Sequence, residues 1–235
     1  WSVTPIAIVL LWFFELGAVL STAVIFVFIA VFVWGIRLTY NWAINFKGMH
    51  HQDWRYTYYR NKNPKIWPIT NFFGIHYMPT LIVYLSLISA AIAMEFQGDY
   101  ISVPIMALGM TISVVAASIQ FIADKQMREF RLNPENKGKS IEEGLWKYSR
   151  HPNYFGEIMM WWGLFILQLG VVPYYISVIG PIAMTLLFLF ISIPLMENHV
   201  VAKRPNYIDY QKRVSPLAFW FQRKPIKEEE YERTN

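Results

Sequence analysis

The sequence contains no cysteine and little charge, and both absences restrict the kind of protein that it can encode. Without cysteine there is no disulfide framework, no thiolate nucleophile and no Cys-based metal site. Charged residues make up 16% of the chain, whereas apolar residues make up 55% and aromatic residues 17%. A soluble domain has about 25% charged residues, so this composition indicates a protein whose solvent is largely lipid.

The sequence also lacks the short motifs by which many soluble enzymes hold phosphates and metals. It has no Gly-x-Gly-x-x-Gly turn between a strand and a helix, which excludes a Rossmann domain as the holder of a nucleotide. It has no Walker loop and no His-Glu-x-x-His zinc pair, and His50, His51 and His76 lack the spacing of metal ligands. We therefore expect no bound metal, and we expect no nucleic acid partner.

Long apolar stretches predict an all-α integral membrane protein. Residues 101–123 and 170–196 carry no charge, and each stretch exceeds the ~20 residues that a helix needs to cross a bilayer. The chain begins at Trp1 without a signal-peptide pattern, so we expect preceding sequence to be missing and a seventh helix to lie in it. A single transmembrane domain is predicted over residues 1–221, followed by a polar tail at 222–235. The six predicted spans are 2–17, 19–44, 75–96, 101–131, 153–170 and 174–203.

The basic residues mark one side of the membrane. The turns on the opposite side, near 17–21, 97–100 and 170–173, contain no Lys or Arg. The positive-inside rule assigns the basic side to the cytoplasm. We therefore expect a multi-pass protein of a bacterial inner membrane, with its basic loops and C-terminus in the cytoplasm. All 21 Lys and Arg residues fall within 37–65, 125–150 and 203–233.

Four polar residues share one face of the fourth span where it leaves the membrane. Gln120, Asp124, Arg128 and Arg131 follow one another at steps of four, four and three, which is the spacing of one helical face. A carboxylate near the hydrocarbon boundary is costly, and it is usually paired or functional. An ion pair between Asp124 and Arg128 explains only two of the four residues. A face that contacts a ligand explains all of them, and we favour it.

Residues 150–157, Arg-His-Pro-Asn-Tyr-Phe-Gly-Glu, form a polar entrance to the fifth span. A Pro in the first helical turn wastes no backbone donor, and the free N–H groups of that turn attract anions. The alternative is a well-capped helix with a snorkelling arginine. The last span also ends in polar residues, Glu197, Asn198 and His199, followed by Lys203. A lone His at a helix end is most often a solvated cation. Here, however, several polar helix ends reach the same membrane face, which is typical of a ligand site.

The residue types at this face suit a phosphorylated nucleotide. Arginine forks are well matched to phosphates. Asn153, Asp124, Glu157 and the tyrosines suit ribose hydroxyls and an amide. The cations available to a phosphate are Arg128, Arg131, Arg150, Lys203 and Arg204.

Residues 144–157 closely resemble the C-terminal signature of the steroid 5-alpha-reductase (3-oxo-5-alpha-steroid 4-dehydrogenase) family, and the resemblance extends over about residues 34–220. It implies a seven-helix bundle with a cofactor site at the cytoplasmic helix ends. It also implies NADPH-dependent reduction of a C=C bond conjugated to a ketone, by hydride transfer to the beta carbon of a lipophilic, steroid- or isoprenoid-like substrate. The flanking patterns that fit are Asp124-x-Gln126-x-x-x-Phe130-Arg131 and Arg204-Pro205-x-Tyr207-x-x-Tyr210.

The resemblance also implies roles for individual residues. Glu15 is the candidate catalytic acid, as a buried carboxyl group that binds the substrate ketone, and the alternative is a carboxylate at a turn between helices. Trp34 stands where the family has a tyrosine, and a tryptophan cannot supply acid catalysis. The residues expected to bind NADPH, by position or by charge, are Gln120, Asp124, Arg128, Arg131, Arg150, Asn153, Tyr154, Glu157, His199 and Lys203.

A second class of membrane enzyme shares part of this pattern. Isoprenylcysteine carboxyl methyltransferases and phospholipid methyltransferases carry a similar Arg-His-Pro-x-Tyr entrance and a late acidic-basic-tyrosine helix. They bind S-adenosylmethionine, which has no phosphate. The stripe of Asp124, Arg128 and Arg131 favours the reductase. A membrane protein without enzymatic activity, binding a lipid or a partner, is the third reading.

Overall fold

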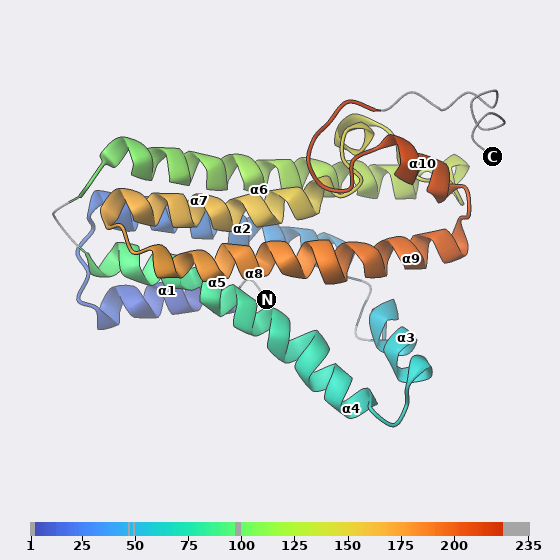
Figure 1. Cartoon of the computed structure of the whole chain (residues 1–235), viewed down its shortest axis with the longest axis horizontal. Helices are drawn as coiled ribbons and strands as arrows, with labels where there is room; N and C mark the ends of the chain where they lie inside the picture. Colours follow the sequence, from blue (N-terminus) through green and yellow to red (C-terminus); the bar gives the residue numbers. More distant parts are fainter. Residues whose placement is uncertain (1–2, 47, 49, 97–99, 223–235) are drawn as a thin grey trace, which may run out of the picture. The chain divides into compact units, whose positions relative to one another are not determined.

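The computed structural model describes residues 3–46, 48, 50–96 and 100–222, and every regular element in them is helical (Figure 1). No strand occurs in these ranges. The α-helices are α1 (Val3–Glu15), α2 (Thr22–Asn45), α3 (Trp54–Lys62), α4 (Trp67–Ile69), α5 (Met78–Glu95), α6 (Val103–Leu132), α7 (Pro152–Val171), α8 (Ile179–Leu187), α9 (Ile193–Lys203) and α10 (Tyr207–Arg213). The π-helices are η1 (Thr70–Tyr77) and η5 (Phe188–Ser192), and the short 3₁₀ helices are η2 (Pro134–Asn136), η3 (Gly144–Lys147) and η4 (Tyr175–Val178).

Within the described residues, five continuous helical stretches are long and apolar enough to cross a membrane, which confirms the predicted all-α integral membrane class. The sixth predicted span, 2–17, is the shorter apolar helix α1 of 13 residues. The division of the N-terminal apolar region at Gly17 is confirmed, because Gly17 has φ +59°, which favours glycine and ends α1. The five stretches are Thr22–Asn45, Trp67–Glu95, Val103–Leu132, Pro152–Val171 and Tyr175–Lys203.

One predicted boundary is wrong. The third span begins at Trp67 and not near residue 75, because α4, η1 and α5 continue one another without a break. Pro68 lies in the first turn of α4, where its missing N–H removes no helical hydrogen bond.

Contacts divide the chain into two compact units. Unit 1 comprises Trp1–Ala117 and Ile158–Thr185, and unit 2 comprises Ser118–Glu157 and Leu186–Asn235. The boundaries fall inside the continuous helices α6, α7 and α8, so the single domain predicted over residues 1–221 stays a prediction. Residues 223–235 of the predicted polar tail and 97–99 of the predicted turn lie outside the described residues.

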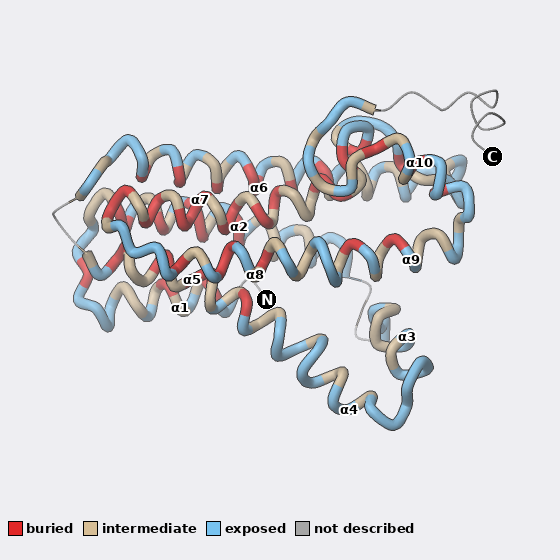
Figure 2. Tube along the Cα trace, viewed as in Figure 1, coloured by how far each residue is buried: buried red, intermediate tan, exposed pale blue. Residues whose placement is uncertain are grey.

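In unit 1, glycines allow α6 and α7 to approach each other closely. A Cβ on Gly109 would lie 2.2 Å from the backbone nitrogen of Leu167, and one on Gly163 would lie 2.4 Å from Oγ of Ser113. Ser113 donates a hydrogen bond of 3.0 Å to the carbonyl of Met160. In the most apolar 18-residue stretch of α7, 61% is buried, against 28–39% in the corresponding stretches of the other four spans. Helix α7 is therefore the most enclosed of the five (Figure 2).

Unit 2 is built around Trp146 of η3. Its indole Nε1 donates to the carbonyl of Ala123 at 3.2 Å, and its own carbonyl accepts from Oη of Tyr210 at 2.5 Å. These two bonds join α6, the turn before α7 and α10. The apolar residues that surround them form two clusters, one of Ala123, Met127, Phe130, Ile141, Leu145 and Trp146, the other of Val200, Val201, Tyr207, Tyr210 and Val214.

Candidate functional site

Unit 2 contains all ten residues that were predicted to bind a cofactor. They come from three parts of the sequence, and the fold brings those parts into one compact unit. The C-terminal half of α6 contributes four of them, the entrance of α7 contributes four more, and α9 contributes His199 and Lys203. Glu15 belongs to unit 1.

A buried carboxylate, Glu197 of α9, organises the entrance of α7. Arg150 donates to it through Nε, 2.7 Å from Oε1, and through a terminal nitrogen, 3.3 Å from Oε2. His151 Nε2 lies 3.0 Å from Oε1, and Gln211 Nε2 donates to Oε2 at 2.8 Å. Because an ionised carboxylate only accepts hydrogen bonds, His151 carries its proton on Nε2 in this contact. Glu197 thus joins α9 to the entrance of α7 and to α10.

Most N–H groups of the Arg150 guanidinium donate hydrogen bonds to other residues of unit 2. Besides its two bonds to Glu197, one terminal nitrogen donates to the carbonyl of Gln211 and, at 2.9 Å, to that of Val214. Four of its five N–H groups therefore have partners within the chain. The phosphate contact predicted for Arg150 stays a prediction, and four of its donors already anchor the entrance of α7.

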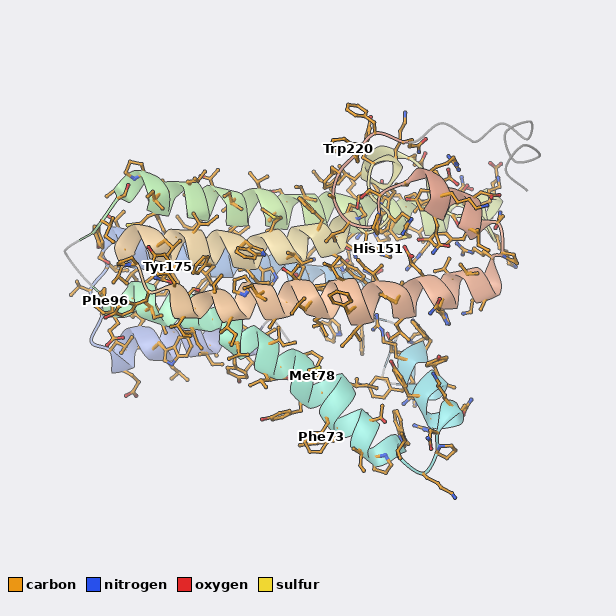
Figure 3. The ribbon with its side chains drawn as sticks, viewed as in Figure 1. Phe73, Met78, Phe96, His151, Tyr175 and Trp220 are labelled. Atoms are coloured by element: carbon orange, nitrogen blue, oxygen red, sulfur yellow. The ribbon has the colours of Figure 1, made fainter. Side chains whose placement is uncertain are left out.

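The segment after α10, residues 214–221, lies along the residues that precede α7. Ser215 accepts from the backbone N–H of Arg150 at 2.9 Å, and Trp220 donates from its backbone to Tyr148 at 3.1 Å. Ser149 Oγ donates to the carbonyl of Leu217 at 2.7 Å. Figure 3 labels Trp220 and His151 in this part of unit 2. The polar entrance is therefore held by the C-terminal segment as well as by Glu197.

At the entrance of α7, the ring of His151 packs against a series of aromatic rings. It lies parallel to the ring of Tyr154, with centroids 5.1 Å apart and an interplanar angle of 7°. Tyr154 in turn contacts the ring of Phe188 in η5 at 4.7 Å. The imidazole is only 5% exposed, so both its orientation and its contact with Glu197 are fixed by packing.

Two of the predicted residues hold buried polar atoms that no hydrogen bond satisfies. Gln120 is 1% exposed, and among the described residues neither its Oε1 nor its Nε2 has a partner. The same holds for Oδ1 of Asn153, in the first turn of α7. An unpaired buried amide costs about 1–3 kcal/mol, so such a group in a native protein calls for a specific explanation. A ligand that pairs with these amides is the simplest one.

The remaining predicted residues of α6 supply accessible charge. Asp124 and Arg128 are half-buried, and Arg131 is exposed at the end of the helix. On α9, His199 is half-buried and Lys203 is exposed. This face of α6 therefore carries one negative group, Asp124, and two positive groups, Arg128 and Arg131, in addition to the buried amide of Gln120.

Tyr207 and Tyr210, which belong to the family pattern after α9, have structural roles. Tyr210 is 2% exposed and donates to the carbonyl of Trp146. Burial raises the pKa of Tyr210 well above its usual value, so the phenol remains a hydrogen-bond donor even in alkaline solution. Burial raises the pKa of Tyr207 in the same way.

The expected burial of Glu15 is wrong. Glu15 is the last residue of α1 and is exposed, next to the turn at Gly17. The chain turns there because Gly17 ends the helix, so no neighbouring element covers the carboxylate. The alternative reading, a carboxylate at a turn between helices, describes its position. Trp34 is a core residue whose ring contacts that of Trp161 at 5.1 Å.

A surface pocket of about 330 Å³ also lies in unit 2, away from the predicted residues. It is formed by the end of α6 and the turns around η2 and η3, and none of the ten residues lines it. The buried amides are the better indication of a ligand, because the side chains of this pocket are open to water. The lining residues are Gln126, Glu129, Phe130, Asn133, Asn136, Glu143 and Gly144.

Comparison with known proteins gives one family and two distant relatives. Residues 1–214 match the family described as "Protein of unknown function (DUF1295)". The chain is 30% identical to "Probable O-methyltransferase ustE" of Ustilaginoidea virens over 73 residues, which cover 31% of this chain and 26% of that protein. It is 25% identical to "Uncharacterized protein C594.04c" of Schizosaccharomyces pombe over 156 residues, which cover 57% of this chain and 45% of that protein. The chain thus spans less than half the length of either relative, and no solved structure matches.

Proposed function

The chain belongs to the DUF1295 family, which is steroid 5-alpha-reductase-like, and from this premise we propose that it is a membrane-embedded, NADPH-dependent reductase. Its substrate is a lipophilic molecule, steroid- or isoprenoid-like, with a C=C bond conjugated to a ketone. The observation that carries the proposal is the buried amide of Gln120, which has no partner in the described part of the chain and shares a helix face with Asp124 and Arg131.

The residues of unit 2 suit a dinucleotide with phosphates. Gln120 and Asn153 offer buried amide atoms to the polar groups of a nicotinamide or a ribose. Arg128 and Arg131 offer guanidinium groups on the same face of α6, and guanidinium forks suit phosphates. Bound NADPH would supply the hydride.

The anchored entrance of α7 supplies orientation. Glu197 fixes Arg150 and His151, and the next residues along the chain include the predicted ligand contacts Asn153 and Tyr154. Catalysis gains from groups that are already held in their productive positions before the ligand arrives. Glu197, Arg150 and His151 are therefore positioning residues in this proposal.

Direct binding to the purified protein in lipid nanodiscs tests the proposal. We expect micromolar affinity for NADPH, and we expect Gln120→Met to weaken it about tenfold because one or two hydrogen bonds are lost. The same change should leave the ligand-free protein equally stable or more stable, since it removes an unsatisfied buried amide.

Gln168→Met is the matched control. Gln168 is also buried, but its amide donates to the carbonyl of Val172 and accepts from Ser177, both at 2.5 Å. This variant should therefore lose stability and keep its NADPH affinity. If Gln120→Met behaved like Gln168→Met, the amide of Gln120 would not be a ligand contact.

A methyltransferase is the second candidate, favoured by the similarity to the probable O-methyltransferase ustE over 73 residues. S-adenosylmethionine has no phosphate, so this reading leaves Arg128 and Arg131 without their proposed role. Titration of the same nanodisc sample with S-adenosylmethionine separates the two. Micromolar binding of S-adenosylmethionine without binding of NADPH rejects the reductase, and binding of neither supports a non-enzymatic lipid- or partner-binding protein.

A further inference from the structure

Helices α3, α4 and η1 of unit 1 form a hairpin, residues 54–77, in which no residue is buried. Tyr56 of α3 holds its two arms together. Its Oη lies 3.4 Å from Nε2 of His76, and its ring centroid lies 6.1 Å from that of Trp67. A helix of nine residues such as α3 is marginal in water when no core supports it. Among the described residues no core supports the hairpin, so a surface outside them would stabilise it.

One arm of the hairpin is apolar on its outer surface. Ile69 is 62% exposed, and Phe72 and Phe73 are each 56% exposed. Figure 3 labels Phe73 on this arm and Met78 where α5 begins; the arm is the first part of the span Trp67–Glu95. Exposed aromatic and aliphatic side chains at the start of a span belong in lipid, and this arm therefore needs no protein partner.

The other arm combines cations with aromatic rings. Arg60 lies 5.4 Å from the ring centroid of Trp67, and Lys62 lies 5.6 Å from that of Tyr58. Tryptophan, tyrosine, lysine and arginine together are typical of the layer of lipid headgroups. The aromatic rings thus contact two of the cations of this arm, Arg60 and Lys62.

The charge of this arm has one sign. Residues 53–67 contain four cations, Arg55, Arg60, Lys62 and Lys65, and one acidic residue, Asp53. Asp53 caps α3 and pairs with Arg55 at 3.3 Å. The other three cations make no ion pair with an acidic group among the described residues. Their positive charge complements phosphate groups.

We propose that this hairpin is a binding surface for anionic phospholipid. In this arrangement α3 lies in the headgroup layer, where Arg60, Lys62 and Lys65 contact the lipid phosphates. The arm of α4 and η1 contacts the acyl chains of the same lipids. The surface belongs to unit 1 and contains none of the residues proposed to bind a cofactor.

Native mass spectrometry of the full chain in detergent, titrated with phosphatidylglycerol or phosphatidylcholine, tests the proposal. The wild type should bind phosphatidylglycerol more tightly. The triple variant Arg60→Gln, Lys62→Gln, Lys65→Gln should lose on the order of a hundredfold in that affinity, about fivefold per cation. Its affinity for phosphatidylcholine should stay within about twofold, because the acyl contacts remain.

A second triple variant, Lys125→Gln, Lys147→Gln, Lys212→Gln, removes the same charge from exposed positions of unit 2. It should keep its affinity for phosphatidylglycerol. Circular dichroism of each variant checks that the helices remain. Equal losses in the two variants would mean diffuse electrostatic attraction and would overturn the proposal. Equal affinity of the wild type for the two lipids would overturn it as well.

Discussion

Breaking the contacts of Glu197 should destabilise unit 2 more than any other single polar change. Glu197→Leu removes the acceptor of four hydrogen bonds and leaves Arg150, whose side chain is 10% exposed, as a buried cation without its counter-charge. Removing one partner of a buried ion pair costs about 3–5 kcal/mol. Arg150→Met should cost about the same, since it leaves the carboxylate uncompensated.

The double variant Arg150→Met, Glu197→Leu should be more stable than either single variant. Replacing both members of a buried pair with apolar side chains of similar size is often neutral, because both desolvation costs disappear together. Unfolding by sodium dodecyl sulfate in mixed micelles, followed by circular dichroism, gives the four free energies of the cycle. We expect an interaction energy of about 3 kcal/mol or more between the two positions.

The exposed pair of Arg213 and Glu142 provides the matched control. Its N–O distance is also 2.7 Å, but the side chains are 25% and 38% exposed. The cycle of Arg213→Met and Glu142→Leu should give an interaction energy of at most about 1 kcal/mol. If the changes at Arg150 and Glu197 were additive to within about 0.5 kcal/mol, the buried pair would not be the link between α7 and α9.

Two further changes probe the turn before α7. Tyr210→Phe should cost about 1–3 kcal/mol, because the buried carbonyl of Trp146 loses its donor. Burial raises the pKa of Tyr210 in the folded protein. The difference in free energy of unfolding between wild type and variant should therefore be constant below pH ~10, where the unfolded phenol ionises, and should fall as the pH rises further. A difference that stays constant up to pH ~11 would contradict this account. Gly144→Ala should cost more than Gly138→Ala. Both glycines have positive φ, but only at Gly144 would the new Cβ meet a neighbour, 2.3 Å from Nε2 of Gln126, and displacing this side chain breaks its hydrogen bond from the backbone N–H of Leu145. If the two variants lowered the unfolding midpoint equally in the same sodium dodecyl sulfate titration, backbone strain alone would explain the cost at Gly144.

Most of the fold was predictable because the signals for membrane spans are local. The length of an apolar run and the absence of charge decide whether a helix can cross lipid, and both can be read without knowing any tertiary contact. The turn at Gly17 was found in this way. The start of the third span was placed near residue 75, eight residues too late, whereas α4 and η1 carry the helix back to Trp67 without a break.

The candidate site was only partly predictable. Helical spacing grouped Gln120 with Asp124, and the polar entrance of α7 drew attention to Arg150. The partner of Arg150 was missed, since nothing local connects residue 150 with Glu197. One signal was available: a carboxylate that follows a long apolar run is costly unless a cation meets it. The burial predicted for Glu15 was wrong for the opposite reason, because a carboxylate at the end of an apolar helix can be exposed.

The contacts of Glu197 also explain why the sequence resembles two classes of enzyme at once. The Arg-His-Pro-x-Tyr pattern is common to the reductases and the methyltransferases. In this chain Arg150 and His151 hydrogen-bond to Glu197, and Arg150 also donates to backbone carbonyls. A motif used for anchoring carries little information about the cofactor. That information must lie in polar atoms that the fold leaves unsatisfied, which in unit 2 include the amide of Gln120 and Oδ1 of Asn153. Under the proposed function, these amides and the charges beside them, and not the most recognisable part of the sequence, would distinguish NADPH from S-adenosylmethionine.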